Sequence, residues 1–214
     1  MKAAVIQASS QKGRNALLFR CVERAVRKKG WEAVNFGVFQ EEEASYSYIQ
    51  AAVNISMLLE SGAVDFVVTG CSSGQGMMLA CNSLPGVLCG YVENPSDAYL
   101  FGRINGGNAV SYPLGLNFGW AGEINLQATL DSLFAGPFGT GYPPKDAARK
   151  QEDTKMLKDI WRKSKKSLAQ VLPELDRDLV LGALGRSAVY DYVMQYGKGQ
   201  GLKDVLRELS EASR

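Results

Sequence analysis

The sequence predicts an α/β fold, a Rossmann-like three-layer sandwich with a five-stranded parallel sheet, followed by a C-terminal helical extension. Three observations predict it. Short apolar segments alternate with segments of helical periodicity over residues 1–136, which is typical of parallel strands joined by crossover helices. The apolar segment 64–70 is nearly continuous and β-branched, as expected of a strand covered on both faces. From Ala135 the composition changes to Gly, Pro and charged residues, which indicates the end of the sheet domain.

Five strand–helix units account for the first part of the chain. The predicted strands are 2–8, 32–37, 64–70, 86–92 and 108–112. The predicted helices are about 15–29, 48–61, a short segment after Gly76, about 95–104 and about 121–134. Parallel sheets of this kind bind ligands at the carboxyl ends of their strands. Cys71 follows the third strand directly, so it lies at one of these ends.

We therefore divide the chain into an α/β domain at 1–136, a linker or arm at 137–152 and a helical extension at 153–214. Three segments of the extension have helical periodicity. The basic run 162–166 within it is better explained as a solvated helix face than as a binding patch.

Composition narrows the class of partner. The chain has 214 residues, of which 46% are apolar, so one main domain with an appendage is expected. Its 24 basic and 22 acidic residues are too balanced for a protein that binds the nucleic-acid backbone. No apolar run approaches the ~20 residues that span a bilayer, and the N-terminal residues become polar too soon for a signal peptide. We expect a cytoplasmic protein that binds neither nucleic acid nor membrane.

Cysteine and histidine limit the possible chemistry. Four cysteines occur without paired metal-ligand spacing, so we expect reduced thiols and no metal site. Histidine is absent, which removes the commonest general acid or base. Any chemistry must use cysteine, carboxylates, tyrosine, serine, lysine or arginine.

The segment GCSSGQGM after the third strand is the strongest chemical signal. Its small residues allow an anion to approach backbone amides just before a helix N-terminus, and the same position favours the thiolate of Cys71. A P-loop is excluded because no Gly-Lys-Ser/Thr follows, and a Cys-x5-Arg phosphatase loop is excluded by Met77. On this segment alone, a buried cysteine beside an ordinary glycine-rich turn is an equally valid interpretation.

The longer segment GCSSGQGMMLACNSLPGVLCGYVENPSDAYLFGRINGGNAV resembles, without a gap, the core of the ribose-5-phosphate isomerase B family, which includes the galactose-6-phosphate isomerase subunits. The resemblance extends more loosely over residues 2–136, and the helical tail is similar to an accessory segment of some longer members. The positions that match the family motif are Cys71, Ser72, Ser73, Gly74, Gly76, Met77, Asn82, Gly86, Asn105 and Asn108.

The resemblance implies aldose–ketose isomerisation of a phosphorylated sugar without a metal or cofactor. Cys71 would move a proton between neighbouring carbons through an enediolate, and amides at Ser72, Ser73 and Gly74 would stabilise its oxyanion. Ser73 keeps the hydroxyl of the family threonine. Tyr46 matches a family active-site tyrosine, although it could also be a half-buried residue at a helix entry.

The departures from the family concern sugar binding. Ala8 and Ser9 replace an Asp-His pair, and Ile104 replaces a histidine that opens the furanose ring. Ser83 and Leu88 replace a lysine and an arginine. Two explanations follow: either the substrate arrives as an open chain, such as a tetrose 4-phosphate, or the protein is a non-catalytic sugar-phosphate binder or a partner subunit. We favour the enzyme because the thiol, glycine and asparagine positions are retained, and a flavodoxin-like nucleotide or regulatory module is a third alternative.

Several basic residues are candidates for binding the substrate anion. Lys145 and Arg149 have the four-residue spacing of two family arginines that reach a neighbouring subunit, and Arg14 follows the first strand. Each of them could instead be a solvent-facing charge. Because the family shares its active sites between chains, the resemblance implies a homodimer or homotetramer. Phe118 and Trp120 offer aromatic material for an interface or for the core.

Overall fold

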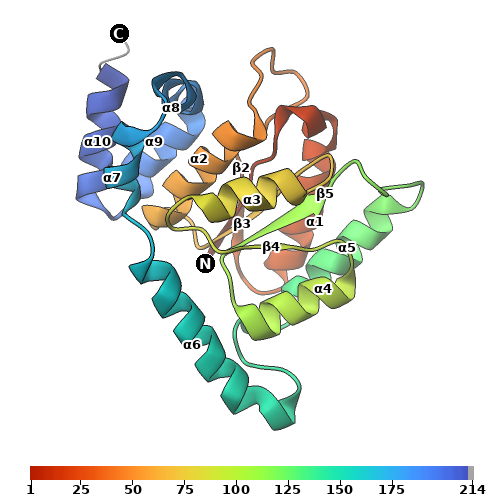
Figure 1. Cartoon of the computed structure of the whole chain (residues 1–214). Coiled ribbons are helices and arrows are strands. Elements are labelled where there is room, and N and C mark those ends of the chain that lie inside the picture. The colour runs from red at the N-terminus through yellow and green to blue at the C-terminus, as the bar shows by residue number, and fades with distance from the viewer. Residues whose placement is uncertain (212–214) are drawn as a thin grey trace.

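The computed structural model describes residues 1–211 and confirms the predicted α/β fold. Its single sheet has five parallel strands in the order β2-β1-β3-β5-β4 (Figure 1). The strands are β1 Lys2–Val5, β2 Glu32–Asn35, β3 Phe66–Cys71, β4 Cys89–Tyr91 and β5 Ala109–Pro113. The central strand β3 pairs with β1 and β5, and all six of its residues are buried, as its apolar sequence predicts.

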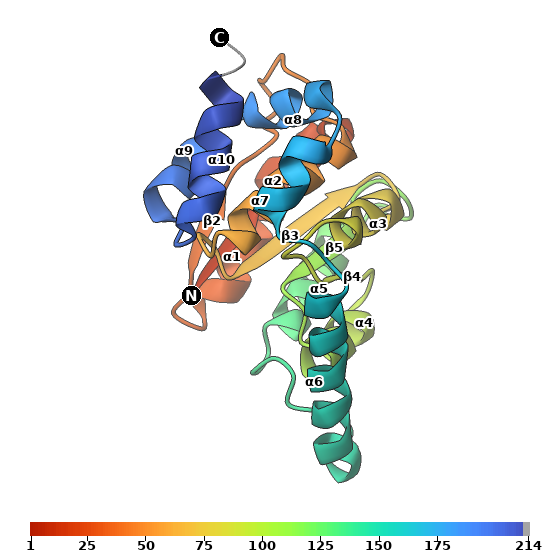
Figure 2. The ribbon, with the colours of Figure 1, turned by 60° about the vertical axis from the view of Figure 1, so that its left-hand side comes forward.

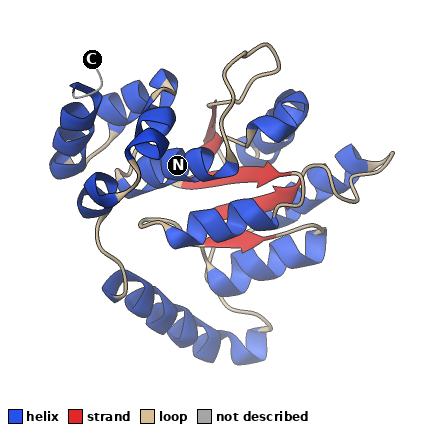
Figure 3. Cartoon of the chain, turned by 45° about the horizontal axis from the view of Figure 1, so that its top comes forward, coloured by secondary structure: helices blue, strands red, loops and turns tan. Residues whose placement is uncertain are grey.

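Helices cover both faces of the sheet (Figure 3). One layer contains α2 Tyr48–Glu60 and α3 Gln75–Ser83, and the other contains α1 Asn15–Arg27, α4 Pro95–Leu100 and α5 Gly122–Leu133. Each layer has its own hydrophobic core against the sheet. Helix α2 begins at a capping box, in which the side chains of Ser47 and Gln50 each bond to the backbone of the other residue.

The element boundaries differ from the sequence prediction in places. The polar segment after β1 forms a short 3-10 helix, η1 Ser9–Arg14. The helix expected at 95–104 ends as α4 at Leu100 and continues as one π-helical turn, η2 Phe101–Asn105. Strand β4 is shorter than the predicted 86–92 and, as an edge strand, pairs only with β5. The segment expected to be a linker contains a short 3-10 helix, η3 Pro144–Asp146, and the start of α6 Ala147–Lys163.

The C-terminal extension packs on the α2 face of the sheet domain. It comprises α7 Leu168–Val171, η4 Leu172–Glu174, α8 Arg177–Leu184, α9 Ser187–Tyr196 and α10 Gln200–Glu211. Helices α7, α8 and α9 contact α2, and their buried residues belong to the same core cluster as the α2 and α3 side chains. The extension is therefore packed as a continuation of one of the two cores.

Helix α6 stands away from the rest of the protein (Figure 2). Hydrogen bonds attach it to the sheet domain: Thr154 Oγ1 donates to the carbonyl of Ile104 at 2.6 Å, and Trp161 Nε1 donates to the carbonyl of Val87 at 3.1 Å. The apolar side chains of Met156 and Ile160 are 57% and 64% exposed on it. Within residues 1–211, no helix has the length and apolar composition needed to cross a membrane.

Candidate active site

Cys71 is the last residue of β3 and lies at the carboxyl edge of the sheet, between the exits of β1 and β5. On one side the amide of Ala8 donates to the carbonyl of Gly70 at 3.2 Å. On the other side Cys71 pairs in register with Pro113, and its carbonyl accepts from the amide of Leu114 at 3.0 Å. Its side chain is buried, with 9% of the residue exposed. The sheet topology thus puts the thiol where parallel sheets bind their ligands.

In the turn after Cys71, backbone carbonyls accept hydrogen bonds while several backbone amides donate none to the residues that the structure describes. The Ser72 carbonyl accepts from the amides of Gly115 and Leu116 at 3.0 and 2.7 Å, and the Gly74 carbonyl accepts from the hydroxyl of Ser111 at 2.6 Å. Within the described residues 1–211, the amides of Ser72, Ser73 and Gly74 have no protein acceptor. Free amides just before a helix N-terminus are groups that favour anions.

Gly74 makes this turn possible. Its φ of +74° lies in the left-handed region, and a Cβ there would lie 2.9 Å from the Tyr91 ring and 3.0 Å from the backbone nitrogen of Pro113. Gly76, in the first turn of α3, lies beside the Tyr48 ring. A Cβ at Gly76 would fit at ordinary contact distance, 3.6 Å from that ring, so Gly74 alone of the two reflects a close approach between the turn and its neighbours.

Residues from η1 and from the loop after β2 form a wall beside the turn. Ser9 and Tyr46 are joined by two hydrogen bonds: the Ser9 amide donates to the Tyr46 carbonyl at 3.0 Å, and the Tyr46 amide donates to Ser9 Oγ at 2.6 Å. Gln11 Nε2 donates to the Ser72 hydroxyl at 2.9 Å. The predicted residues Ser9, Tyr46 and Ser72 are thus brought together near Cys71.

Arg14 ends η1 on the same side of the sheet. Its guanidinium lies 4.1 Å from the ring centroid of Phe118, a buried residue of the loop after β5. It is exposed, and no acidic side chain among residues 1–211 forms an ion pair with it. Its charge is therefore available to a bound anion.

The side-chain amides of Asn82 and Asn108 form hydrogen bonds with backbone groups of the protein. Asn82 donates to the carbonyl of Cys89 at 2.8 Å and accepts from the Cys89 amide at 2.9 Å. Asn108 accepts from the Leu88 amide at 2.7 Å and donates to the Gly86 carbonyl at 2.7 Å. Both side chains hold the segment that leads into β4, so their amide groups have a structural role in this fold.

Asn105, Lys145 and Arg149 lie away from Cys71. Asn108, three residues after Asn105, accepts from the amide of Val67, which is four residues before Cys71 on β3. At about 3.3 Å per strand residue, this places the start of β5 roughly 13 Å from Cys71, at the opposite edge of the sheet. Asn105 is exposed there, and Arg149 on α6 is paired with Asp153 at 2.8 Å. One chain does not bring these three residues to the thiol.

Glu42 and Arg186 are two further residues at the site wall that the sequence did not indicate. The guanidinium of Arg186, which lies between α8 and α9, makes two 2.8 Å bonds to the Glu42 carboxylate. It also lies 4.8 Å from the ring centroid of Tyr46. The hydrogen bonds from Arg186 are the main cause that lowers the pKa of Glu42.

Other cysteines and tyrosines have environments that suppress their ionisation. Burial raises the pKa of the Cys21 thiol. A hydrogen bond with Cys81, together with burial, raises the pKa of Cys89. Burial and a hydrogen bond to Glu93 raise the pKa of Tyr91 to about 12. These groups are therefore neutral near pH 7. Over residues 1–211, no three His, Cys, Asp or Glu side chains cluster as metal ligands.

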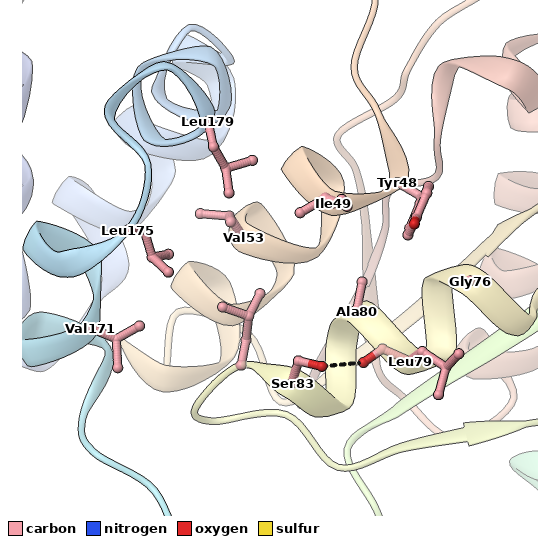
Figure 4. A pocket seen from close by; sticks show the side chains of 11 residues that line it. Tyr48, Ile49, Val53, Gly76, Leu79, Ala80, Ser83, Val171, Leu175 and Leu179 are labelled. Atoms are coloured by element: carbon pink, nitrogen blue, oxygen red, sulfur yellow. Dashed lines mark hydrogen bonds between the residues drawn. The ribbon is translucent and has the colours of Figure 1, made fainter.

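An apolar groove lies beside the site, between α2, α3 and the extension (Figure 4). Its volume is about 410 Å³, and Tyr48 and Gly76 form the end nearest to the turn. The lining is otherwise mainly aliphatic, with side chains such as Leu79, Leu175 and Leu179. Because it offers few hydrogen-bonding groups, it suits a sugar poorly.

The chain is similar to known proteins over nearly its full length. A family model described as Ribose/Galactose Isomerase matches residues 13–118. No curated protein gives a match. A solved 4-deoxy-L-threo-5-hexosulose-uronate ketol-isomerase, complexed with a tartrate, is 37% identical; the match covers 99% of this chain and 100% of that one, with a TM-score of 0.94.

Two other solved structures show how far the likeness extends. A ribose-5-phosphate isomerase from Vibrio parahaemolyticus is 35% identical, and the match covers 98% of this chain and 99% of that one with a TM-score of 0.92. A type B ribose 5-phosphate isomerase from Leishmania infantum is 14% identical over 77% of this chain and 98% of its own, with a TM-score of 0.60. The last likeness is one of fold alone.

Proposed function

Because the chain belongs to the ribose/galactose isomerase family, as the sequence motif predicted, we propose that it interconverts an aldose and a ketose by proton transfer at Cys71. The observation that carries this proposal is the position of the Cys71 thiol. It lies at the carboxyl edge of the sheet and is followed directly by three backbone amides that have no acceptor among the described residues.

The reaction follows from these groups. The Cys71 thiolate removes the proton from the hydroxyl-bearing carbon next to the carbonyl. The electrons of that C–H bond form the C=C bond of an enediolate, and the former carbonyl oxygen takes the negative charge. Amides of Ser72, Ser73 and Gly74 stabilise this oxyanion, and one such donor is typically worth about 3 kcal/mol of barrier. Cys71 then returns the proton to the former carbonyl carbon, and the electrons of the C=C bond form that new C–H bond. At the same time the neighbouring hydroxyl gives up its proton and becomes the new carbonyl, and one proton passes to the oxyanion. We assign the Ser73 hydroxyl to hydrogen bonding with these reacting oxygens.

For the substrate we propose an open-chain acidic sugar. The chain has no histidine, so the ring-opening base that the family resemblance implies is missing. The name 4-deoxy-L-threo-5-hexosulose-uronate, given to the substrate of the relative at 37% identity, describes a sugar acid without the hydroxyl at carbon 4 and with a carbonyl at carbon 5. Neither hydroxyl that closes a furanose or pyranose on carbon 1 is present in such a molecule. It therefore needs no ring-opening residue.

A phosphorylated sugar is the second candidate, favoured by the ribose-5-phosphate isomerase name of the relative at 35% identity. A tetrose 4-phosphate would meet the same open-chain requirement. In either case we assign the substrate anion to Arg14, because an exposed guanidinium without an acidic partner can bind a carboxylate or a phosphate with two parallel hydrogen bonds.

We further propose that the active sites are shared in a homodimer. Because Asn105 and the pair Lys145 and Arg149 lie away from the thiol of their own chain, we assign them to the active site of a second copy. The exposed Met156 and Ile160 on α6 give a second copy an apolar surface to cover.

The test is an isomerase assay of the purified chain on three sugars: 4-deoxy-L-threo-5-hexosulose-uronate, erythrose 4-phosphate and ribose 5-phosphate. We expect the uronate to be converted, Cys71→Ala to abolish conversion, and Cys21→Ala to keep it, because Cys21 is buried on α1 in the other core. Conversion by Cys71→Ala at the wild-type rate would refute the proposed base. Binding of a sugar by the wild type without turnover would instead support a non-catalytic binder.

A further inference from the structure

The loop between β2 and α2 is held by a buried guanidinium of the C-terminal extension. Arg186 is 5% exposed, and its Nε donates to the carbonyl of Phe36, the residue that follows β2. Its Nη1 and Nη2 donate to the two carboxylate oxygens of Glu42 at 2.8 Å each. This is a bidentate pair, which arginine provides and lysine does not. It fixes the orientation of both the guanidinium and the carboxylate.

Glu42 joins this guanidinium to the rest of the loop. Its Oε1 also accepts from the amide of Phe39 at 2.9 Å, which closes the turn 39–42. Its carbonyl accepts from Lys12 Nζ of η1 at 3.1 Å. One carboxylate residue therefore connects the extension, the loop after β2 and the exit of β1.

Tyr46 connects the same guanidinium to the candidate active site. Its ring lies 4.8 Å from the Arg186 guanidinium, within the range of a cation–π contact. Its backbone makes two hydrogen bonds with Ser9, at 3.0 and 2.6 Å. The residue before Ser9, Ala8, bonds to Gly70 at 3.2 Å, and Gly70 precedes Cys71. A continuous series of contacts thus runs from Arg186 to the backbone of Gly70, which is bonded to Cys71.

We propose that Arg186 is a positioning residue. It acts through Glu42 and the ring of Tyr46 to hold the Tyr46 wall, which is Tyr46 with its hydrogen-bonded partner Ser9, in the position relative to Cys71 that catalysis requires. By this device the C-terminal extension contributes to catalysis through the loop between β2 and α2. The inference rests on the proposed function, since it requires that the Tyr46 wall faces the sugar. A purely structural ion pair is the alternative that the experiment must exclude.

Three variants test the inference. Glu42→Gln removes the charge and keeps the side-chain shape, Arg186→Lys keeps the charge and removes the bidentate geometry, and Tyr46→Leu removes the ring. Lys166→Gln is the matched control, because Lys166 and Glu174 form an ion pair of the extension that is 58% and 61% exposed. Two quantities are measured for each: amide hydrogen exchange of residues 37–47, and kcat and KM for the three sugars named above.

We expect Glu42→Gln and Arg186→Lys to speed the exchange of residues 37–47 and to lower kcat/KM by up to about 100-fold, the loss typical of a misplaced wall residue. In the Tyr46→Leu background, Glu42→Gln should cause little further loss, because residues that act as one unit are not additive. Lys166→Gln should change neither quantity.

Two outcomes would overturn the inference. One is unchanged exchange of residues 37–47 in both folded variants. The other is faster exchange with wild-type kcat/KM, which would make Arg186 a structural residue only. If the wild type converts none of the sugars, the proposed function fails separately, and the exchange measurement alone then decides whether Arg186 holds the loop.

Discussion

Replacing Gly74 by alanine perturbs the turn that is expected to stabilise the enediolate. The residue has a φ of +74°, and an added Cβ would lie 2.9 Å from the ring of Tyr91 and 3.0 Å from the backbone nitrogen of Pro113. The left-handed conformation costs a residue other than glycine about 1–2 kcal/mol. The contact with Pro113 involves backbone, so a side-chain rotation cannot relieve it, and overpacking of this kind costs about 1–3 kcal/mol.

Gly74→Ala should therefore lower the free energy of unfolding by about 2–5 kcal/mol. The turn must also shift, which moves the amides of Ser72, Ser73 and Gly74. Loss of one oxyanion donor costs about 10²–10³ in kcat, so we expect at least this loss in the molecules that remain folded.

Gly30→Ala is the matched control. Gly30 has a φ of +68°, but a Cβ there meets no atom within 4 Å, and the residue follows α1 away from the candidate site. Urea unfolding should show only the conformational cost of about 1–2 kcal/mol, with wild-type kcat. Equal unfolding free energies and equal kcat values for the two variants would refute the role given to the turn.

Two further predictions concern Asn82 and Glu42. Asn82→Ala removes the hydrogen-bond partners of the Cys89 carbonyl and amide, so it should lower the free energy of unfolding by about 1–3 kcal/mol and leave KM unchanged. A raised KM with wild-type stability in urea would mean instead that Asn82 binds substrate. Because Arg186 lowers the pKa of Glu42 below that of an ordinary glutamate, the ion pair stabilises the fold fully above the ordinary pKa. This stabilisation is lost as the pH falls through the lowered pKa. The stability difference between wild type and Glu42→Gln should thus be largest at neutral pH and shrink on acidification, and a difference that grows in acid would contradict the ion pair.

The sheet was predictable from the sequence because local patterns dictate it. The run that became β3 is apolar on both faces, and Gly74 after Cys71 occupies a position where the backbone requires glycine. The ends of the elements were less predictable. Strand β4 contains only Cys89–Tyr91, and the length over which a strand pairs with its neighbour depends on tertiary structure that local periodicity does not encode.

The candidate site was predictable in part. Cys71, Ser72, Ser9 and Tyr46 come together because their segments leave adjacent strands at one edge. Asn82 and Asn108 resembled ligands because a side-chain amide bonds as readily to backbone as to a sugar, and only the tertiary structure shows which partner it has. Arg186 gave no signal, since its partner Glu42 is 144 residues away in sequence.

The most direct test of proton transfer at Cys71 is isomerisation in deuterium oxide, followed by proton magnetic resonance. A proton held on a thiol exchanges with solvent during the lifetime of the enediolate. The wild-type protein should therefore place deuterium on the carbon next to the carbonyl of the product, and Cys71→Ala should form no product. Wild-type turnover that leaves the original hydrogen on that carbon in every product molecule, or deuterium incorporation by Cys71→Ala, would contradict the account.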